Sequence, residues 1–446
     1  MEATQLWSHW QALLQPCTDA FTAAGGHRFR EWLTGLVLNT EEHTITQSLV
    51  GLDRPQDWKA LESFAEYGAW DQDLLDEFTA PLIDQALGRL WFGYRVWAGD
   101  DTKVHRSSAH VWGTGTFHEY TARCPNRATT VRAHNWVVLG ALVPRDHQPA
   151  WFLPHTGRLY FRRSQLPAGE TFHTKCDLLV GQLQREADYV PGKHLAAFDG
   201  GFALRNVVRP LVVPAAGQPR IDILTRLRKD ARLHALPPKV RPKGQRGPRR
   251  KWGRRLPPPR QGGRWPGGWQ EGQAYLYGRK RTVRWKEVWC LWRVLGHEVV
   301  VKAVVAEVEG FRKRFYLVSS ATDLTGLQIV TIFAARFRQE DGFRDLKQRL
   351  GWEECRAWTK KPILRTTQLQ LLAMTLLRLL QFRLEADTED SWWFHPPWNP
   401  RKTRPSVLDL GRLFQRHRSA IQQLLADSLP KRPNSPEGTA GARAAD

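Results

Sequence analysis

The stretch "YLVSSATDLTGLQIVTIFAARFRQEDGFRDLKQRLG", residues 316–351, reads as a strand, a short connection and a long helix. Its first residues are apolar and β-branched, which is typical of a strand. Thr325 is followed three residues later by Gln328, the pattern of a capping box, so we expect the helix to begin there. Gly342 weakens a helix by about 1 kcal/mol relative to Ala, which suggests that close packing or the close approach of a partner molecule requires it.

The helix carries its charges in a fixed order. Phe333, Arg336, Glu340 and Lys347 are separated by three, four and seven residues, steps that return to one face of a helix with 3.6 residues per turn. A carboxylate is therefore placed between two cations. A solvated helix with ion pairs would show the same pattern, with Glu340 paired to Arg336 or Arg344.

Two more carboxylates follow apolar runs. The run in "YRVWAGDDTKVHR", residues 94–106, leads to Asp101, and the run in "KHLAAFDGGFALRNV", residues 193–207, ends at Asp199 before Gly-Gly and a helix. Two acids at strand ends and one on a later helix can converge across an α/β sheet. Such hard oxygen ligands select Mg²⁺ or Mn²⁺, and a pair of these ions serves phosphodiester chemistry. Taken singly, each acid is more often a turn residue or a solvated one.

The charge of the chain implies a polyanionic partner. The net charge is +22, with a pI of about 10.2, which favours nucleic acid ahead of a membrane surface. Residues 1–100 hold fifteen Asp and Glu against six Lys and Arg, whereas residues 226–264 hold fifteen Lys and Arg and one acid. The second stretch is rich in Pro and Gly, so we expect a loop or an extended arm.

The density of arginine in residues 226–264, with tryptophans between, favours contact with phosphates and stacking over a solvated surface. The candidate contacts are Arg249, Arg250, Lys251, Arg254 and Arg255. Beyond the arm, residues 282–295, 297–309 and 310–320 are predicted to form strands.

Composition excludes several classes of protein. With 446 residues, 41% of them hydrophobic, the chain is globular and long enough for two to four domains. It has no apolar run of the roughly 20 residues that cross a bilayer, and its first residues lack the pattern of an export signal, so we expect a cytoplasmic protein. The five cysteines form no CxxC, so neither a disulfide framework nor a zinc ribbon is indicated.

On these residues the chain resembles bacterial insertion-sequence transposases of the DDE superfamily, in the group with the signature Y-(2)-R-(3)-E-(6)-K. Phe333, Arg336, Glu340 and Lys347 keep all three spacings, and only the tyrosine is replaced. "GDDT", residues 99–102, resembles the family's first Asp motif, in which the Asp directly precedes Thr. This resemblance points to Asp101, with Asp100 as the alternative.

"AAFDGGFA", residues 196–203, resembles the second Asp strand of the same family and points to Asp199. The resemblance covers about residues 95–380 and is weak outside them. It implies an α/β fold: an RNase H-like catalytic core that is interrupted by a β-rich basic insertion, with an N-terminal helical domain and C-terminal helices.

The expected domains are the following: a helical N-terminal domain, 1–90; the first part of the core, 91–227; the basic arm and β-rich insertion, 228–316; the second part of the core with the catalytic helix, 317–385; and a C-terminal helical region, 386–446, ending in a disordered tail from about residue 430. Whether the N-terminal domain binds DNA ends or pairs two copies stays open.

The resemblance implies a DNA transposase that binds the inverted-repeat ends of its element, cuts DNA and joins strands. Asp101, Asp199 and Glu340 would hold two Mg²⁺ or Mn²⁺ ions. Arg336 and Lys347 would contact double-stranded DNA near the cleaved strand. The protein would act as a homodimer in a synaptic complex, in the bacterial cytoplasm on the nucleoid.

The sequence offers further candidate contacts. Phe333 stands where the signature has tyrosine, and it has no hydroxyl to donate to DNA. We therefore expect it to pack or to stack. Lys103, His105 and Arg106 are candidate backbone contacts beside the first Asp. Some relatives hold a flipped base with a tryptophan of the insertion. Trp292, with Trp285 and Trp289, is a candidate here, although at this spacing the pattern favours burial in the strand core.

Three other functions compete with this one. A DNA-binding descendant without catalysis would have lost one of the acids, yet all three are present. A stand-alone metal-dependent nuclease on the same fold would hydrolyse DNA without joining strands. An RNA-binding protein would account for the basic arm and leave the three acids unexplained.

Overall fold

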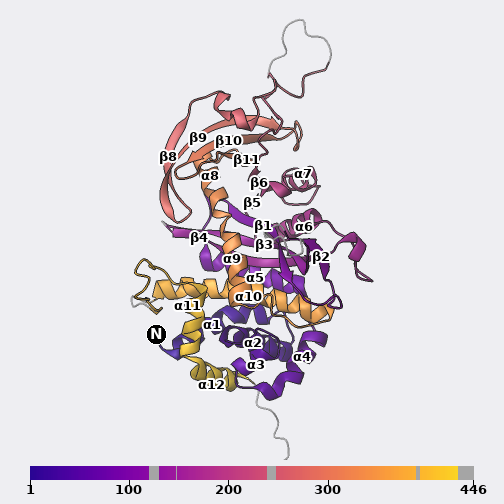
Figure 1. Ribbon diagram of the computed structural model, residues 1–446, viewed down its shortest axis with the longest axis vertical. Helices are drawn as coiled ribbons and strands as arrows, with labels where there is room; N and C mark the ends of the chain where they lie inside the picture. Colours follow the sequence, from indigo (N-terminus) through magenta and orange to yellow (C-terminus); the bar gives the residue numbers. More distant parts are fainter. Residues whose placement is uncertain (120–129, 147, 239–247, 388–391, 430–446) are drawn as a thin grey trace, which may run out of the picture.

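The computed structural model describes residues 1–119, 130–146, 148–238, 248–387 and 392–429. Its centre is a mixed sheet with the strand order β2-β3-β1-β5-β6-β11-β10-β9-β7, in which β4 also pairs with β3 and β8 with β9 (Figure 1). The strands are β1 (Arg95–His105), β2 (Gly115–His118), β3 (Thr130–Arg145), β4 (Gln148–Tyr160), β5 (His194–Phe198), β6 (Ile221–Arg226), β7 (Leu233–His234), β8 (Gln270–Leu276), β9 (Arg279–Trp292), β10 (Val300–Val308) and β11 (Phe315–Ser319).

Five of these strands form the part of the sheet that carries the acids. β4 and β3 are antiparallel, β3 and β1 are antiparallel, and β1, β5 and β6 run parallel to one another. The parallel connections pass through helices on one side of the sheet, as the right-handed crossover rule requires. This mixed α/β arrangement is consistent with the RNase H-like core that the resemblance implies.

The strands predicted in residues 282–295, 297–309 and 310–320 are confirmed as β9, β10 and β11. β11 pairs with β6, so β9 and β10, which fall in the expected insertion, continue the central sheet together with β11. The arm is extended and holds only β7 and the short 3₁₀ turn η4 (Pro259–Arg264) in its described part. The arm residues 239–247 lie outside the described residues.

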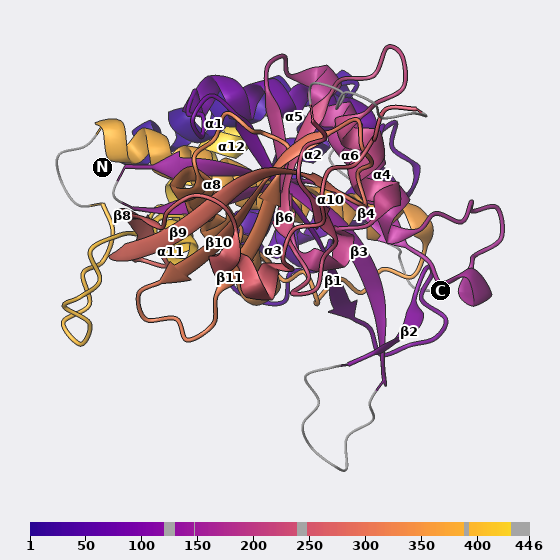
Figure 2. The same ribbon diagram turned by 90° about the horizontal axis from the view of Figure 1, so that it is seen from above.

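Helices cover both faces of the sheet and build a layer below it (Figures 1 and 2). They are α1 (Ala3–Thr18), α2 (Ala23–Leu38), α3 (Gln47–Gly51), α4 (Trp58–Tyr67), α5 (Gln72–Leu87), α6 (Lys175–Tyr189), α7 (Arg205–Val212), α8 (Gly326–Ala335), α9 (Arg338–Arg349), α10 (Lys360–Asp387), α11 (Val407–Arg416) and α12 (Arg418–Ser428), with short 3₁₀ turns η1 (Pro55–Asp57), η2 (Arg163–Gln165) and η3 (Gly200–Phe202). None of the helices in the described ranges is long and apolar enough to cross a membrane.

The N-terminal and C-terminal helices form one layer. Trp10 of α1 packs edge-on against Phe414 of α11, with ring centroids 5.2 Å apart. Arg365 of α10 is buried and donates hydrogen bonds to the carbonyl oxygens of Phe64, Ala65 and Gly68 at the end of α4. These contacts place α10 across the first helices. The predicted disordered tail from about residue 430 lies outside the described residues.

The long helix predicted from Thr325 is two helices. The capping box of Thr325 and Gln328 is confirmed at the start of α8. The helix is interrupted at Arg336 and Phe337, where the amides bond three residues back: Gln339 to the carbonyl of Arg336 and Glu340 to that of Phe337. Glu340 therefore lies in the first turn of α9, where the helix dipole favours a negative charge.

Candidate active site

Asp100 and Asp101 lie on opposite faces of β1. Asp100 is paired with Val138 of β3, and Asp101 with Val137. Val138 belongs to the core cluster beneath α8 and α9, whereas Val137 belongs to the cluster beneath α6 and α7. Because side chains alternate along a strand, the two carboxylates point into different layers of the molecule.

Asp101 lies on the α6 side of the sheet. Its Oδ2 is 2.6 Å from Nζ of Lys175, the first residue of α6. The sequence points to Asp101 as the ligand that joins Asp199 and Glu340, but the pleat of β1 turns its side chain away from α9. On this geometry Asp100, the alternative, is the better placed of the two.

Asp100 and Glu340 share one guanidinium. Nη1 of Arg336 is 3.6 Å from Oδ2 of Asp100, and Nη2 of Arg336 is 3.8 Å from Oε1 of Glu340. Arg336 is mostly buried, with 11% of its side chain exposed, whereas Glu340 is about half exposed. The break between α8 and α9 places Arg336 and Glu340 together beside Asp100 of β1.

Asp199 directly follows β5, with an extended backbone. Ala197, two residues earlier, is paired with Ala98 of β1 and belongs with it to the cluster beneath α8. Alternation therefore places Asp199 on the face of Asp100. Burial raises the pKa of Asp100 to about 6, against the lowering effect of Arg336, and the charges of Asp101 and Asp199 raise it further. Asp100 and Asp199 are thus close enough to repel each other.

The three carboxylates Asp100, Asp199 and Glu340 fit a divalent metal by their chemistry. They are hard oxygen donors on one face of the sheet, and mutual repulsion disfavours their joint ionisation unless a cation is present. Within the described ranges, however, no three His, Cys, Asp or Glu side chains are gathered closely enough to hold a metal ion. The guanidinium of Arg336 stands between two of them, and a bound metal requires these side chains to rearrange.

Arg336 also has spare donors. Its Nε and Nη1 are buried and have no hydrogen-bond partner among the described residues. Its guanidinium lies 5.7 Å from the ring centroid of Phe333. Phe333 itself is 7% exposed and packs in the core, so the structure favours packing over contact with a ligand.

Lys347 reaches β1 and the segment after α9. Its Nζ donates a hydrogen bond to the carbonyl oxygen of Lys103 and lies 3.4 Å from Oε1 of Glu353. Nζ of Lys103 donates to the carbonyl oxygen of His118. Both lysines line an open groove beside Asp101.

Two further candidates beside the first acids have structural partners. Arg106 donates to the carbonyl oxygen of Glu353 at 2.9 Å and to Nδ1 of His134 at 3.1 Å, so it ties β1 to the segment after α9. Nδ1 of the exposed His105 lies 3.6 Å from Oε1 of Glu353.

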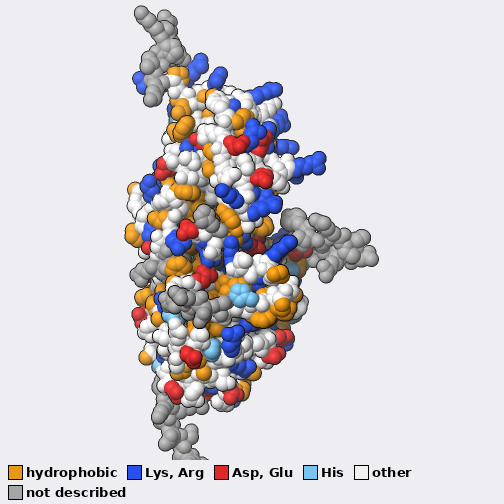
Figure 3. Space-filling model, turned by 90° about the vertical axis from the view of Figure 1, so that its left-hand side faces the viewer, with side chains coloured by type: hydrophobic (Ala, Val, Ile, Leu, Met, Phe, Trp, Pro, Cys, Tyr) orange, Lys and Arg blue, Asp and Glu red, His pale blue; other side chains and the backbone are white. Residues whose placement is uncertain are grey.

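The candidate contacts in the arm are exposed: Arg249, Arg250, Lys251, Arg254 and Arg255. Lys and Arg side chains are dense over the upper part of the molecule, where the insertion lies (Figure 3). The prediction that Trp292 contacts DNA is corrected, because its side chain is 4% exposed and packs in the core. Trp285 is buried too, whereas Trp289 is half exposed and its ring centroid lies 4.9 Å from Nζ of Lys302.

Tyr277 is a neighbour of the site that sequence reasoning missed. It occupies the turn between β8 and β9 with a φ of 51°, and its ring packs against Phe311 and Phe337. Burial raises the pKa of Tyr277, and the charge of Arg336 acts in the opposite direction. Only the fold brings this hairpin to the start of α9, so no local signal in the sequence could have found it.

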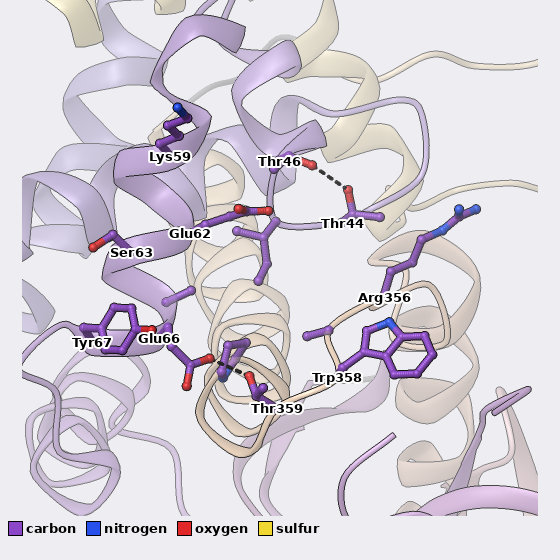
Figure 4. A pocket seen from close by; sticks show the side chains of 14 residues that line it. Thr44, Thr46, Lys59, Glu62, Ser63, Glu66, Tyr67, Arg356, Trp358 and Thr359 are labelled. Atoms are coloured by element: carbon purple, nitrogen blue, oxygen red, sulfur yellow. Dashed lines mark hydrogen bonds between the residues drawn. The ribbon is translucent and has the colours of Figure 1, made fainter. Parts of the chain in front are cut away.

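A second hollow, of about 580 Å³, lies between α4 and the segment before α10 (Figure 4). Its wall carries Lys59, Tyr67 and Trp358, and the hydroxyl of Thr359 donates to Glu66. It shares no residue with the acid site or with the groove beside Asp101.

Comparison with known proteins identifies the family of the chain. A sequence profile described as DDE superfamily endonuclease matches residues 17–289, which include Asp100, Asp101 and Asp199. No curated protein matches the chain. The profile ends before α9, so the assignment of Glu340 to the site rests on the geometry and on the resemblance of its helix to the family's catalytic helix. Since the match spans more than half of the chain, the protein belongs to the DDE superfamily endonuclease family.

Proposed function

We propose that the protein is a DNA transposase that cuts and joins strands at the inverted-repeat ends of its element, with Asp100, Asp199 and Glu340 as its metal ligands. The observation that carries this proposal is the shared guanidinium: Asp100 and Glu340 both lie within 4 Å of Arg336. The charge of Asp199 acts on Asp100 from the neighbouring strand. Membership of the endonuclease family supports DNA as the substrate.

The proposed role of each residue follows from its charge and its donors. When bound, a pair of Mg²⁺ or Mn²⁺ ions supplies activation of the attacking oxygen and stabilisation of the leaving one. Asp100, Asp199 and Glu340 would hold the ions, and Arg336 would offer Nε, which has no hydrogen-bond partner among the described residues, to an oxygen of the reacting phosphate. Lys347 lies on the same helix as Glu340 and contributes a second positive charge to the DNA beside it.

The test uses the sequences that flank the gene. Purified full-length protein is incubated with duplex DNA carrying those flanks and Mg²⁺, and the 3′ ends and joined products are mapped. The proposal expects cleavage at the ends of short inverted repeats, followed by joined strands. Metal-dependent cleavage without paired ends or joined products would make the protein a nuclease, and binding without any cleavage would make it a DNA-binding descendant.

Two copies are expected to act together, because both ends of an element must be held before strands are joined. The same reaction tests this expectation. If products form only when both ends are present, and at a rate that rises more than linearly with protein concentration, the paired complex is supported. Independent cutting of single ends would contradict it.

A further inference from the structure

An open groove lies on the α6 side of β1, beside the candidate active site. Its volume is about 730 Å³, and residues of β1, β2, β3, β4, α6 and α9 line it. The groove contains Asp101, which is turned away from the other acids, and Lys347, which comes from the helix that carries Glu340. The groove therefore reaches α9 through Lys347, although Asp101 lies on the side of β1 opposite Asp100.

The wall of this groove contains an asparagine without partners. Asn135 of β3 is 0% exposed, and neither its Nδ2 nor its Oδ1 has a hydrogen-bond partner in the part of the chain that the structure describes. It is paired with Lys103 of β1 on one side and Tyr160 of β4 on the other. Burying an amide with both ends unpaired is costly, so a molecule in the groove, whether water or a ligand, completes its hydrogen bonds.

The cations around Asn135 indicate the charge of that ligand. Lys175 lies 2.6 Å from Asp101 and 5.3 Å from the ring centroid of Tyr160. Arg162 is exposed and donates to the carbonyl oxygen of Thr116 through one nitrogen, Nη1. Each of these cations has more donors than these partners use. An anion with several acceptor oxygens suits the groove.

We propose that the groove binds the sugar–phosphate backbone of the DNA strand that runs past the cleaved phosphodiester. The amide of Asn135, which is covered in this structure, donates to a phosphate oxygen when the side chains over it move aside, and Lys175 and Arg162 neutralise neighbouring phosphates. Asp101 orients Lys175 at the mouth of the groove. This inference rests on the proposed function, because it takes DNA as the ligand.

The test measures binding of duplex DNA carrying the flanking ends by the full-length protein, over a range of salt concentrations. Lys175→Ala and Arg162→Ala are each expected to reduce the slope of log K against log salt by about 0.9, the contribution of one phosphate contact to B-DNA. Lys59→Ala is the matched control, since Lys59 is an exposed lysine in the separate hollow of Figure 4. Its slope is expected to equal that of the unaltered protein.

Asn135→Leu separates a ligand contact from a structural role. Removing an unpaired buried amide is expected to leave the thermal midpoint equal or higher, while the affinity for DNA falls about tenfold. Equal affinity in Asn135→Leu, with unchanged slopes in Lys175→Ala and Arg162→Ala, overturns the proposal. If the unaltered protein cuts and joins DNA in that case, only the proposal that the groove binds DNA is wrong. If the unaltered protein does not bind this DNA at all, the proposed function fails first.

Discussion

Asp100 and Asp101 are neighbours in the chain, yet they serve different layers of the molecule. The sequence could narrow the first ligand to this pair but could not choose between them. Alternation of polar and apolar residues normally reveals which face of a strand is buried, but here both faces of β1 are covered by helices. The choice requires the pairing of Asp100 with Val138, which only the fold provides.

His134 gives a prediction at the same scale. Its Nδ1 accepts a hydrogen bond from Nε of Arg106, and its Nε2 bonds the carbonyl oxygen of Trp112, so the folded protein holds the neutral ring. Burial lowers the pKa of His134 from 6.5 to about 4, and the charge of Arg106 adds to this. Between those pH values the unfolded chain binds a proton that the folded chain excludes. The contribution of His134 to the free energy of unfolding is therefore complete above pH 6.5, and it is lost as the pH falls towards 4.

The measurement is urea unfolding at pH 7.5 and pH 5. The unaltered protein is expected to lose about 2 kcal/mol more of its unfolding free energy between these pH values than His134→Gln does. Asp100, whose pKa is raised, titrates with the opposite sign in both proteins and cancels from the comparison. An identical loss in the two proteins would show that His134 is not held neutral.

At the scale of elements, the helix of residues 316–351 shows what local pattern can and cannot predict. The capping box at Thr325 is local and is confirmed. The interruption at Arg336 and Phe337 is not encoded by a proline or glycine, so the sequence predicts one continuous helix. The hydrogen bonds there shorten to three residues, which joins α8, packed on the insertion strands, to α9, packed on β4.

Gly342 of α9 is predicted from the sequence to have a packing or a DNA-approach reason, and the structure shows packing. A Cβ there would lie 2.5 Å from Cδ1 of Phe152 of β4. We expect Gly342→Ala to destabilise the protein by about 1–2 kcal/mol, since the cost of overpacking exceeds the gain in helix propensity. Gly181→Ala in α6 is the matched control, because a Cβ there meets nothing within 4 Å.

Urea unfolding of the two glycine variants checks this expectation. Gly181→Ala should be more stable than the unaltered protein by up to about 1 kcal/mol, through propensity alone. If Gly342→Ala gained as much, the ring of Phe152 would not be a tight neighbour, and the packing of α9 on β4 would need revision.

At the scale of the whole molecule, segments that lie far apart in the sequence pack against one another in the fold. The acidic first hundred residues read as an independent helical domain, yet Arg365 and Phe414 show that the C-terminal helices pack into the same layer. The insertion strands likewise extend the central sheet through β11. Contacts between residues hundreds of positions apart leave no local signature, which is why composition could not predict them.

The uneven charge is a property of the whole molecule and predicts how it binds DNA. Arg249, Arg250 and Lys251 are exposed on the arm. Figure 1 shows the strands that follow the arm, β8, β9 and β10, at the end of the molecule away from the acidic N-terminal helices. Replacing all three by Gln is expected to flatten the salt dependence of DNA binding by up to about 2.7 in slope, which is 0.9 for each phosphate contact. An unchanged slope would show that the arm does not contact the phosphates of this DNA.

The central claim is that Asp100, and not Asp101, completes the metal site with Asp199 and Glu340. The most direct measurement compares Asp100→Asn and Asp101→Asn in Mg²⁺-dependent cleavage of the flanking-end DNA, with binding of the same DNA measured in parallel. We predict that Asp100→Asn and Glu340→Gln lose more cleavage rate than the roughly 100-fold that the loss of a residue supporting a metal ligand can cost, and that both still bind the ends. Asp101→Asn should retain cleavage within about tenfold. Full cleavage by Asp100→Asn, together with loss of cleavage in Asp101→Asn, would contradict the account.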